Sequence, residues 1–413
     1  MRRCGVALLV VLGAGVVSMR GADAGLFAAL GRIGPGGPAL RTLSEQELTD
    51  MMVGAAILCT RGVNTQSMIQ RVRDAVREGH TFRMVSVEEL PDDWLVFSSF
   101  VVGGGGAWPH VTERLKRQGI KPDPRAPSAG DVLSGHLGSR FNAIFEAEAG
   151  NATVHALLIA ARMGIPIVDG CPSGRCLPEV QMNPFFMNGI TRAPLAAVTP
   201  YGDTILMPAV RDDFRVEDLT RALAVASGGR VTVAANAVRG DVLKRNVIPG
   251  FLSTCMRLGR AAREAVAEGR DPIAAVAAAG EGFVLFRGTV RRSDSRAEGG
   301  FGWTNAYLDG VGDFAGSTYR IYNKNENLIA WRDGKLDAAA PDLVAALDPR
   351  TGWAMRGGTV IGSFVVGEDL AIVGFPSHPL WRTSSAIGML APRYFGFDEV
   401  YVPIEVLHGG RRP

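Results

Sequence analysis

Two acidic residues in the first half of the chain follow segments that are typical of strands. Glu148 lies in a Glu-Ala-Gly element just after the short apolar segment 141–145, and Asp169 ends the apolar run 165–169. Carboxylates at strand ends can orient a water molecule or accept a substrate N–H, as a general acid or base must. The plainer interpretation is a solvated acid and a helix cap.

A dense polar run in the second half is a further candidate for chemistry. It reads Asn-Lys-Asn-Glu-Asn at 323–327 and is followed by the apolar segment 328–331. A simple hairpin turn needs one Asn and one Gly. Amide side chains offer a donor and an acceptor each, so Asn and Glu together could bracket a ring that contains amides. A structural turn and a ligand site both stay open.

Four glycines at 103–106 separate an apolar strand from a helix that begins at Pro109. Consecutive backbone amides before a helix can bind an anion, which makes Gly104 and Gly105 candidates for substrate binding. The alternative is a flexible turn, because neither G-x-G-x-x-G nor G-x-x-x-x-G-K-[ST] is present. The cofactor is unknown, since no motif identifies one.

Cysteines and histidines give weaker indications. Cys171 and Cys176 have a C-x4-C spacing, which could form a small disulfide loop in an exported protein or leave two free thiols. This spacing is wide for a zinc site, and a second pair is missing. The six histidines show no H-x-H or H-x-x-x-H pair. No metal ligand is therefore predicted, although a metal-dependent amidohydrolase stays as an alternative.

The composition excludes several classes of protein. The chain has 413 residues with a formal net charge of +3, and it contains no block of Lys and Arg. Such a balance argues against a nucleic-acid partner. Hydrophobic residues make up 47% and charged residues 21%, which is typical of a globular protein and excludes a mainly disordered chain.

The first residues resemble an export signal. Arg2 and Arg3 precede an apolar run at 6–17, and Ala-Asp-Ala follows at 22–24. This is the order of a secretory signal peptide, and the run is too short for a stable membrane span. We therefore expect an exported or periplasmic protein. A transit peptide or a misassigned start would instead make the protein organellar or cytoplasmic.

The elements that would position these residues indicate two domains. Helices are predicted at 44–55, 66–78, 109–118 and 152–163, and strands at 81–87, 94–102, 141–145 and 165–169. Near-continuous apolar strands that alternate with helices predict an α/β domain with a parallel or mixed sheet. In such sheets ligands lie beyond the carboxyl ends of the strands. The glycine- and proline-rich segment 121–138 is expected to be a loop.

The second half begins with helices at 214–227 and 248–268 and continues with short strands and turns from 283 onward. This pattern predicts a β-rich C-terminal domain. The expected divisions are a leader at 1–24, a linker at 25–43, an α/β domain at 44–202, a C-terminal domain at 203–405 and a tail at 406–413. The segment 204–280 could belong to either domain.

A family resemblance rests on short motifs that occur in a fixed order. They are GAAIL within 48–58, LPDD at 90–93, AARMGIPIVDG at 160–170, GRCLPEVQM at 174–182, NENLIAWRDG at 325–334, PDL at 341–343, PLWRT at 379–383 and YVPIE at 401–405. From residue 44 to 405 the chain resembles the S-methyl thiohydantoin desulfurase family, long described as a domain of unknown function beside hydantoinases.

The resemblance implies an N-terminal α/β domain, a β-rich C-terminal domain and a hydrolase. Water would attack a carbon of a sulfur-substituted hydantoin-like ring, and a thiol would leave. The residues that match the family's acidic elements, and are expected to be catalytic, are Glu148, Asp169 and Glu326. The expected substrate-binding residues are Asn325, Asn327, Gly104, Gly105 and Arg175, the last for a substrate carboxylate.

The sequence also departs from the family pattern. The usual turn G-T-G-G-G-G-D-P after the first helix reads C-T-R-G-V-N-T at 59–65, and the usual D-A-D reads D-G-C at 169–171. A non-catalytic ligand-binding protein on the same scaffold therefore stays as an alternative to the hydrolase. The expected partner is a small-molecule substrate, without nucleic acid or a stable membrane span. A homo-oligomer is left open.

Overall fold

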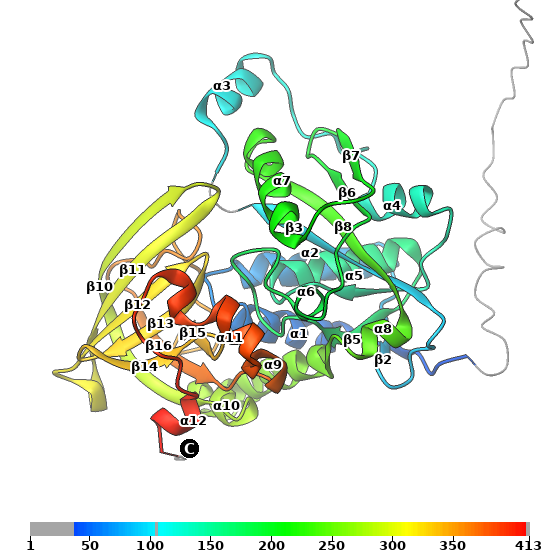
Figure 1. Cartoon of the computed structure of the whole chain (residues 1–413). Coiled ribbons are helices and arrows are strands. Elements are labelled where there is room, and N and C mark those ends of the chain that lie inside the picture. The colour runs from blue at the N-terminus through cyan, green and yellow to red at the C-terminus, as the bar shows by residue number, and fades with distance from the viewer. Residues whose placement is uncertain (1–36, 104–105, 410–413) are drawn as a thin grey trace, which may run out of the picture. The chain divides into compact units, whose positions relative to one another are not determined.

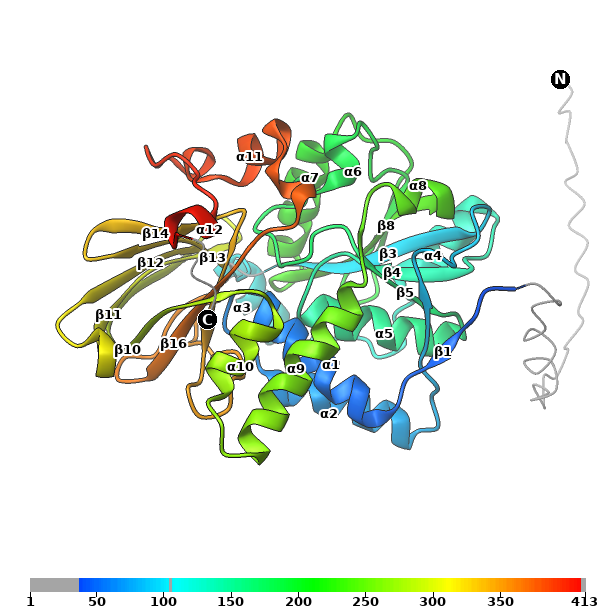
Figure 2. The same cartoon turned by 90° about the horizontal axis from the view of Figure 1, so that it is seen from below.

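The computed structural model describes residues 37–103 and 106–409. The leader-like segment 1–24, most of the expected linker, Gly104 and Gly105 lie outside the described residues. Two sheets organise the described chain. Figures 1 and 2 show the strands of the first sheet at the right and those of the second sheet at the left.

The first sheet has nine strands in the order β1-β2-β5-β4-β3-β8-β6-β7, and β9 pairs with β5. The neighbours β2, β5, β4 and β3 run parallel, whereas the other pairs are antiparallel. The bounds are β1 (Arg41–Thr42), β2 (Arg83–Ser86), β3 (Leu95–Gly103), β4 (Ala143–Glu146), β5 (Ile167–Cys171), β6 (Leu195–Val198), β7 (Thr204–Met207), β8 (Arg230–Arg239) and β9 (Ile248–Pro249). The predicted mixed sheet is confirmed.

Alternate residues of the central strands pack into two cores, because side chains alternate between the faces of a strand. Ile144 and Ile167 face the core that α1, α2 and α5 cover. Phe145 and Val168 face the opposite core, which α6 and α8 cover. The helices of this half are α1 (Glu45–Leu58), α2 (Thr65–Arg77), α3 (Pro109–Arg117), α4 (Ala129–Leu137), α5 (Asn151–Met163), α6 (Pro184–Met187), α7 (Asp213–Ala226) and α8 (Gly240–Lys244).

Helix α4 corrects the expected loop at 121–138. The side chain of Ser128 caps the helix by accepting a hydrogen bond from the backbone N–H of Asp131, and Gly138 ends it with φ of 61°. Leu133 is fully buried between these caps. The helix is only nine residues long, so its weak apolar pattern was outweighed in the sequence by the surrounding Pro, Gly and Ser.

The second sheet is all antiparallel, as the expected β-rich domain requires, and it curls into a half-barrel (Figure 1). Its order is β14-β13-β12-β11-β10-β16-β15. The bounds are β10 (Phe283–Glu298), β11 (Phe301–Gly310), β12 (Thr318–Lys324), β13 (Glu326–Arg332), β14 (Lys335–Ala339), β15 (Leu343–Leu347) and β16 (Asp369–Phe375). Short elements follow or interrupt the strands: η2 (Gly312–Phe314), η3 (Pro379–Arg382), α11 (Ser384–Leu390), η4 (Pro392–Phe395) and α12 (Ile404–Leu407).

The segment 204–280 contributes to both halves. Its strands β7 and β8 belong to the first sheet, while α9 (Phe251–Ala267) packs on α1 and α10 (Pro272–Ala279) packs on β10 and β16. Helices α1 and α9 touch backbone to backbone: a Cβ on Gly259 would lie 1.9 Å from the carbonyl oxygen of Asp50. One apolar core continues from the first sheet through these helices to β15 and β16.

Within the parts of the chain that the structure describes, no helix is long and apolar enough to cross a membrane.

Candidate active site

A cavity of about 310 Å³ lies where strand ends of the first sheet meet a turn of the second. Its floor includes the end of β3, the residues after β4 and the start of α5, which is where ligands lie in sheets of this kind. Both domains contribute to its lining, which comprises Arg61, Phe100, Val101, Val102, Gly103, Ala147, Glu148, Asn151, Ala152, Leu177, Pro178, Glu179, Val180, Arg192, Arg221, Gly229, Arg230, Asn325 and Ile361.

Glu148 is the predicted catalytic residue that lines this cavity. It follows β4, and its Oε2 accepts a hydrogen bond of 3.0 Å from the backbone N–H of Leu177. Burial raises the pKa of the Glu148 carboxyl, while the positive charges of Arg61 and Arg192 oppose that rise. A buried carboxyl that borders a cavity and lies beside fixed cations can exchange a proton with a group bound there.

Arg61 and Glu326 form a buried ion pair that joins the two domains. Nη1 of Arg61 lies 2.8 Å from Oε1 of Glu326, whose side chain is fully buried. The loop that carries Arg61 is fixed to the turn of the second sheet, because Thr60 accepts a 2.9 Å hydrogen bond from the backbone N–H of Asn327. Arg61 lines the cavity, and Glu326 lies behind it.

The pKa of Glu326 is raised to about 8. Burial is the largest cause. Arg61 lowers the pKa, and the neighbouring carboxyl of Glu148 raises it. Glu148 and Glu326 thus share one guanidinium, and two carboxylates that share a site do not ionise independently.

Two further arginines of the lining are held by acids and carbonyls. Nε of Arg192 lies 3.3 Å from Oδ2 of Asp213. Nε of Arg221 donates a 2.7 Å hydrogen bond to Glu217, and its Nη1 donates to the carbonyl oxygens of Gly103 at 2.7 Å and of Gly300 at 3.2 Å. Arg221 therefore links the end of β3 to the β10–β11 turn.

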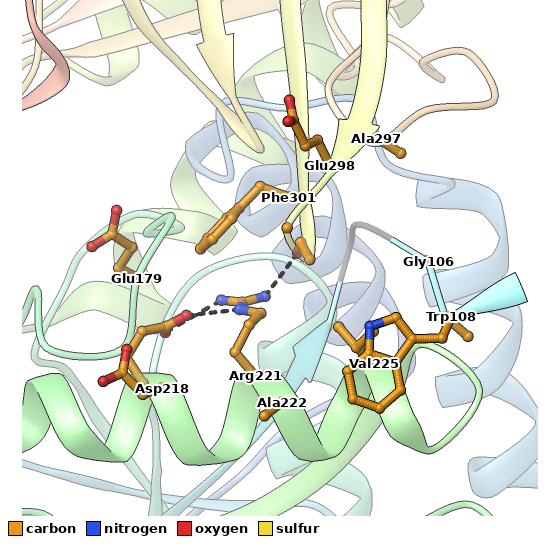
Figure 3. Close-up of a pocket in the computed structure, with 14 residues that line it drawn as sticks. Gly106, Trp108, Glu179, Asp218, Arg221, Ala222, Val225, Ala297, Glu298 and Phe301 are labelled. Atoms are coloured by element: carbon orange, nitrogen blue, oxygen red, sulfur yellow. Dashed lines mark hydrogen bonds and ion pairs between the residues drawn. The ribbon is translucent and has the colours of Figure 1, made fainter. Parts of the chain in front are cut away.

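A second cavity of about 620 Å³ adjoins the first and shares Arg221 and Glu179 with it. Figure 3 shows Arg221 with Phe301 of the β10–β11 hairpin and the indole of Trp108 on different sides of it. The partners of the Arg221 guanidinium are Glu217 and the carbonyl oxygen of Gly300 in the β10–β11 turn. The guanidinium carbon of Arg221 lies 4.3 Å from the ring centre of Phe301. Trp108 remains 47% exposed, so this cavity has an open aromatic wall.

The polar run 323–327 forms the tight connection between β12 and β13. Asn325 reaches the cavity, adopts φ of +61°, and accepts a 2.8 Å hydrogen bond from the backbone N–H of Gly302. Asn327 points into the protein instead, where it donates to the carbonyl oxygen of Val344 at 3.0 Å and accepts from Asn323. The run therefore serves both as a structural turn and as part of the cavity wall.

Asp169 and Arg175 are not among the residues that line this cavity. Asp169 lies at the end of β5 and accepts hydrogen bonds from the backbone N–H and the hydroxyl of Ser253, at 3.1 and 2.6 Å. Arg175 is fully buried and donates to the carbonyl oxygens of Cys176, Pro341, Asp342 and Asn327. Its guanidinium thus joins the loop after β5 to the second domain.

Sequence reasoning did not select the arginines of the cavity. Arg61 stands in the segment 59–65, where the sequence departs from the family's glycine-rich turn, and that departure was the available signal. Arg192 and Arg221 lie in segments without a motif. Glu179 was also missed; its carboxylate binds Lys324 and accepts a 2.7 Å hydrogen bond from the hydroxyl of Tyr394.

All four cysteines of the described chain are free and buried. The thiols of the C-x4-C element have separate neighbours: Sγ of Cys171 lies 3.3 Å from Oγ of Ser173, whereas Sγ of Cys176 donates to the carbonyl oxygen of Ala149 at 3.0 Å. Across residues 37–103 and 106–409, no group of three or more His, Cys, Asp or Glu side chains is placed to hold a metal ion.

Comparisons with known proteins agree with this architecture. A family model described as S-Me-THD-like, N-terminal domain, matches residues 46–209, and one described as S-Me-THD-like, C-terminal domain, matches residues 211–404. No curated protein matches the chain.

The crystal structure of a protein from Chromobacterium violaceum, a Northeast Structural Genomics Consortium target, has the same fold with a TM-score of 0.69. The two sequences are 20% identical, and the match covers 88% of this chain and 100% of that one. With both family domains matched in order over most of its length, the chain belongs to the S-Me-THD-like family.

Proposed function

We propose that the protein is a hydrolase that acts on a hydantoin-like or S-substituted thiohydantoin ring, with water attacking the ring carbon that bears sulfur. The observation that carries the proposal is that Glu148 and Arg61 line one cavity between the two domains, while Glu326 binds Arg61 from behind that cavity. The family description points to the same ring chemistry.

Glu148 would act as the general base. One of its oxygens is fixed by the N–H of Leu177, which leaves the other for a water molecule in the cavity. The base takes a proton as the water oxygen attacks the ring carbon. The hydroxyl proton of the adduct passes to the ring nitrogen. The carbon–sulfur bond then breaks, the thiolate receives a proton, and the former C–S carbon becomes the carbonyl of a hydantoin. The carboxyl of Glu148 can return its proton to the leaving thiolate, which closes the cycle.

Arg61 would stabilise the negative charge that develops on the ring nitrogen and its adjoining carbonyl oxygen during the attack. A buried, fixed cation is effective in this role because no solvent has to reorganise around it. Glu326 would act as a positioning residue, since its Oε1 accepts a 2.8 Å hydrogen bond from Nη1 of Arg61, which a protonated carboxyl can also accept. Asn325 lines the same wall and could contact the ring amide.

The charge of the cavity favours a substrate with an anionic substituent. Four arginines and two glutamates line it, and Arg230 is an exposed member of that set. Arg192 and Arg221 are partly neutralised by Asp213 and Glu217. Arg230 is thus the cation best placed to bind a carboxylate from solvent.

The test is a substrate screen with hydantoins, thiohydantoins and S-methyl thiohydantoins, in which released thiol and ring opening are both measured. We expect thiol release from an S-methyl thiohydantoin. Glu148→Gln should reduce turnover roughly 10²–10⁴-fold, because it removes the base and keeps the shape of the side chain.

Glu146→Gln is the matched control. Glu146 is the last residue of β4, two positions before Glu148, and it is fully buried. Its carboxyl accepts a hydrogen bond from the hydroxyl of Thr153. Burial raises the pKa of the Glu146 carboxyl well above its usual range and so favours the neutral form, which the amide of glutamine resembles. Full activity of Glu148→Gln would show that Glu148 is not the general base. A parent protein that releases no thiol, yet melts at a higher temperature with a hydantoin, would favour the non-catalytic binding protein.

A further inference from the structure

Two cysteines from distant segments lie near each other, next to the loops that carry Arg61 and Leu177. Cys59 ends α1 and begins the loop that carries Arg61, and Cys176 precedes Leu177, whose N–H binds Glu148. Both side chains are fully buried. Neither thiol is used in the hydrolysis proposed above.

The geometry at Gly150 places both sulfur atoms near one point. Gly150 has φ of +82°, and a Cβ built on it would lie 2.7 Å from Sγ of Cys59 and 3.7 Å from Sγ of Cys176. Both thiols therefore border one point beside the β4–α5 turn. The pKa of the Cys176 thiol agrees with this. Burial raises that pKa most, and the hydrogen bond with the Cys59 thiol raises it further.

We propose that Cys59 and Cys176 are a redox pair that forms a disulfide when the chain folds in an oxidising environment. The pairing differs from the C-x4-C loop that the sequence suggests. In the folded protein Sγ of Cys171 lies beside Ser173 and accepts a 3.3 Å hydrogen bond from the N–H of Gly174. This inference is independent of the proposed hydrolysis.

The oxidant is a low-molecular-weight disulfide such as oxidised glutathione. One protein thiolate attacks its S–S bond, which forms a mixed disulfide and releases one small thiol. The second protein thiolate then attacks the mixed disulfide, forms the Cys59–Cys176 bond and releases the second small thiol. The two protons of the protein thiols pass to the two small thiols, and the two electrons reduce the reagent's S–S bond.

The bond would join the two loops that hold the cavity's charged groups. One loop carries Arg61 and the other fixes Glu148 through Leu177. Because residues 59 and 176 are far apart in the chain, the cross-link restricts the unfolded chain strongly. Burial of both thiols keeps them thiols once the protein has folded reduced, since buried cysteines react slowly.

The experiment refolds the full chain from denaturant in a buffer of reduced and oxidised glutathione, and then counts thiols in denaturant. The chain has five cysteines, so the count should fall from five to three. A non-reducing peptide map should join the peptide of Cys59 to that of Cys176. The melting temperature should rise by roughly 5 °C over the reduced protein.

Three variants separate this pair from other pairings. Cys171→Ser should still form the bond, whereas Cys59→Ser and Cys176→Ser should each keep their four remaining thiols. The wild-type map decides the matter even where a variant folds poorly. A Cys171–Cys176 or Cys171–Cys255 peptide in place of the expected one, or five thiols after refolding, would overturn the proposal.

Discussion

Replacing Glu326 by glutamine should change how the stability of the protein depends on pH. The Glu326 side chain is fully buried against Arg61, and its pKa is raised from 4.5 to about 8. In the unfolded chain the same carboxyl loses its proton near pH 4.5. Between these values the folded state holds a proton that the unfolded state has released.

The sign and size of the effect follow from this difference. A pKa that is raised on folding stabilises the folded state fully below the unfolded pKa, and that stability is lost as pH rises through the folded pKa. The shift from 4.5 to about 8 corresponds to a ceiling of about 5 kcal/mol at about 1.4 kcal/mol per pH unit. Glu326→Gln cannot titrate and should not lose this energy.

The assay is chemical unfolding of both proteins at a series of pH values from 4.5 to 8.5. The free energy of unfolding of the parent, relative to that of Glu326→Gln, should fall steadily with pH by up to about 5 kcal/mol. Arg61→Met serves as a second variant: without the cation that lowers the Glu326 pKa, the fall should extend to higher pH. Parallel curves for the parent and Glu326→Gln would show that Glu326 ionises freely in the folded protein, and the reasoning would fail.

Three further predictions concern packing, an interdomain hydrogen bond and processing. Gly259→Ala should lower stability by at least about 1–3 kcal/mol, because its Cβ would lie 1.9 Å from the carbonyl of Asp50; an unchanged melting temperature would contradict this. Trp381→Phe removes the 2.7 Å hydrogen bond from Nε1 to the carbonyl oxygen of Ser173, so the free energy of unfolding should fall by about 1–3 kcal/mol. An unchanged free energy in chemical unfolding would contradict this. Protein from its native source should begin near Gly25 by intact mass, and an uncleaved chain in the cytoplasm would exclude export.

The sequence predicts local elements well where caps and apolar patterns agree. The capping box of Ser44 and Glu47 is present at the start of α1 as expected. The strands of the parallel sheet were recognisable because both of their faces are buried. Strand β8 also carries a mostly apolar run at 231–235, but its place as a central strand depends on pairing with β3 and β6, which the sequence does not specify.

The site was predictable only in part. The family motifs selected Glu148 and Glu326, and both approach Arg61 in the folded protein. Asp169 has the same sequence signal as Glu148, a carboxylate at a strand end, but its partner Ser253 comes from a helix that only the fold brings near. Arg175 likewise meets its carbonyl partners across the domain boundary. Such distant pairings cannot be inferred from spacing along the chain.

The position of β8 has a consequence for how the protein can be divided. The two family matches meet between residues 209 and 211, yet β8 lies after that point and fills the gap between β3 and β6 in the first sheet. A fragment that stops at residue 210 would expose two unpaired strand edges, which favour aggregation. It would also leave the buried guanidinium of Arg175 without the carbonyls of Pro341 and Asp342. The evolutionary boundary is therefore not a folding boundary, and the two halves should behave as one cooperative unit during synthesis and unfolding.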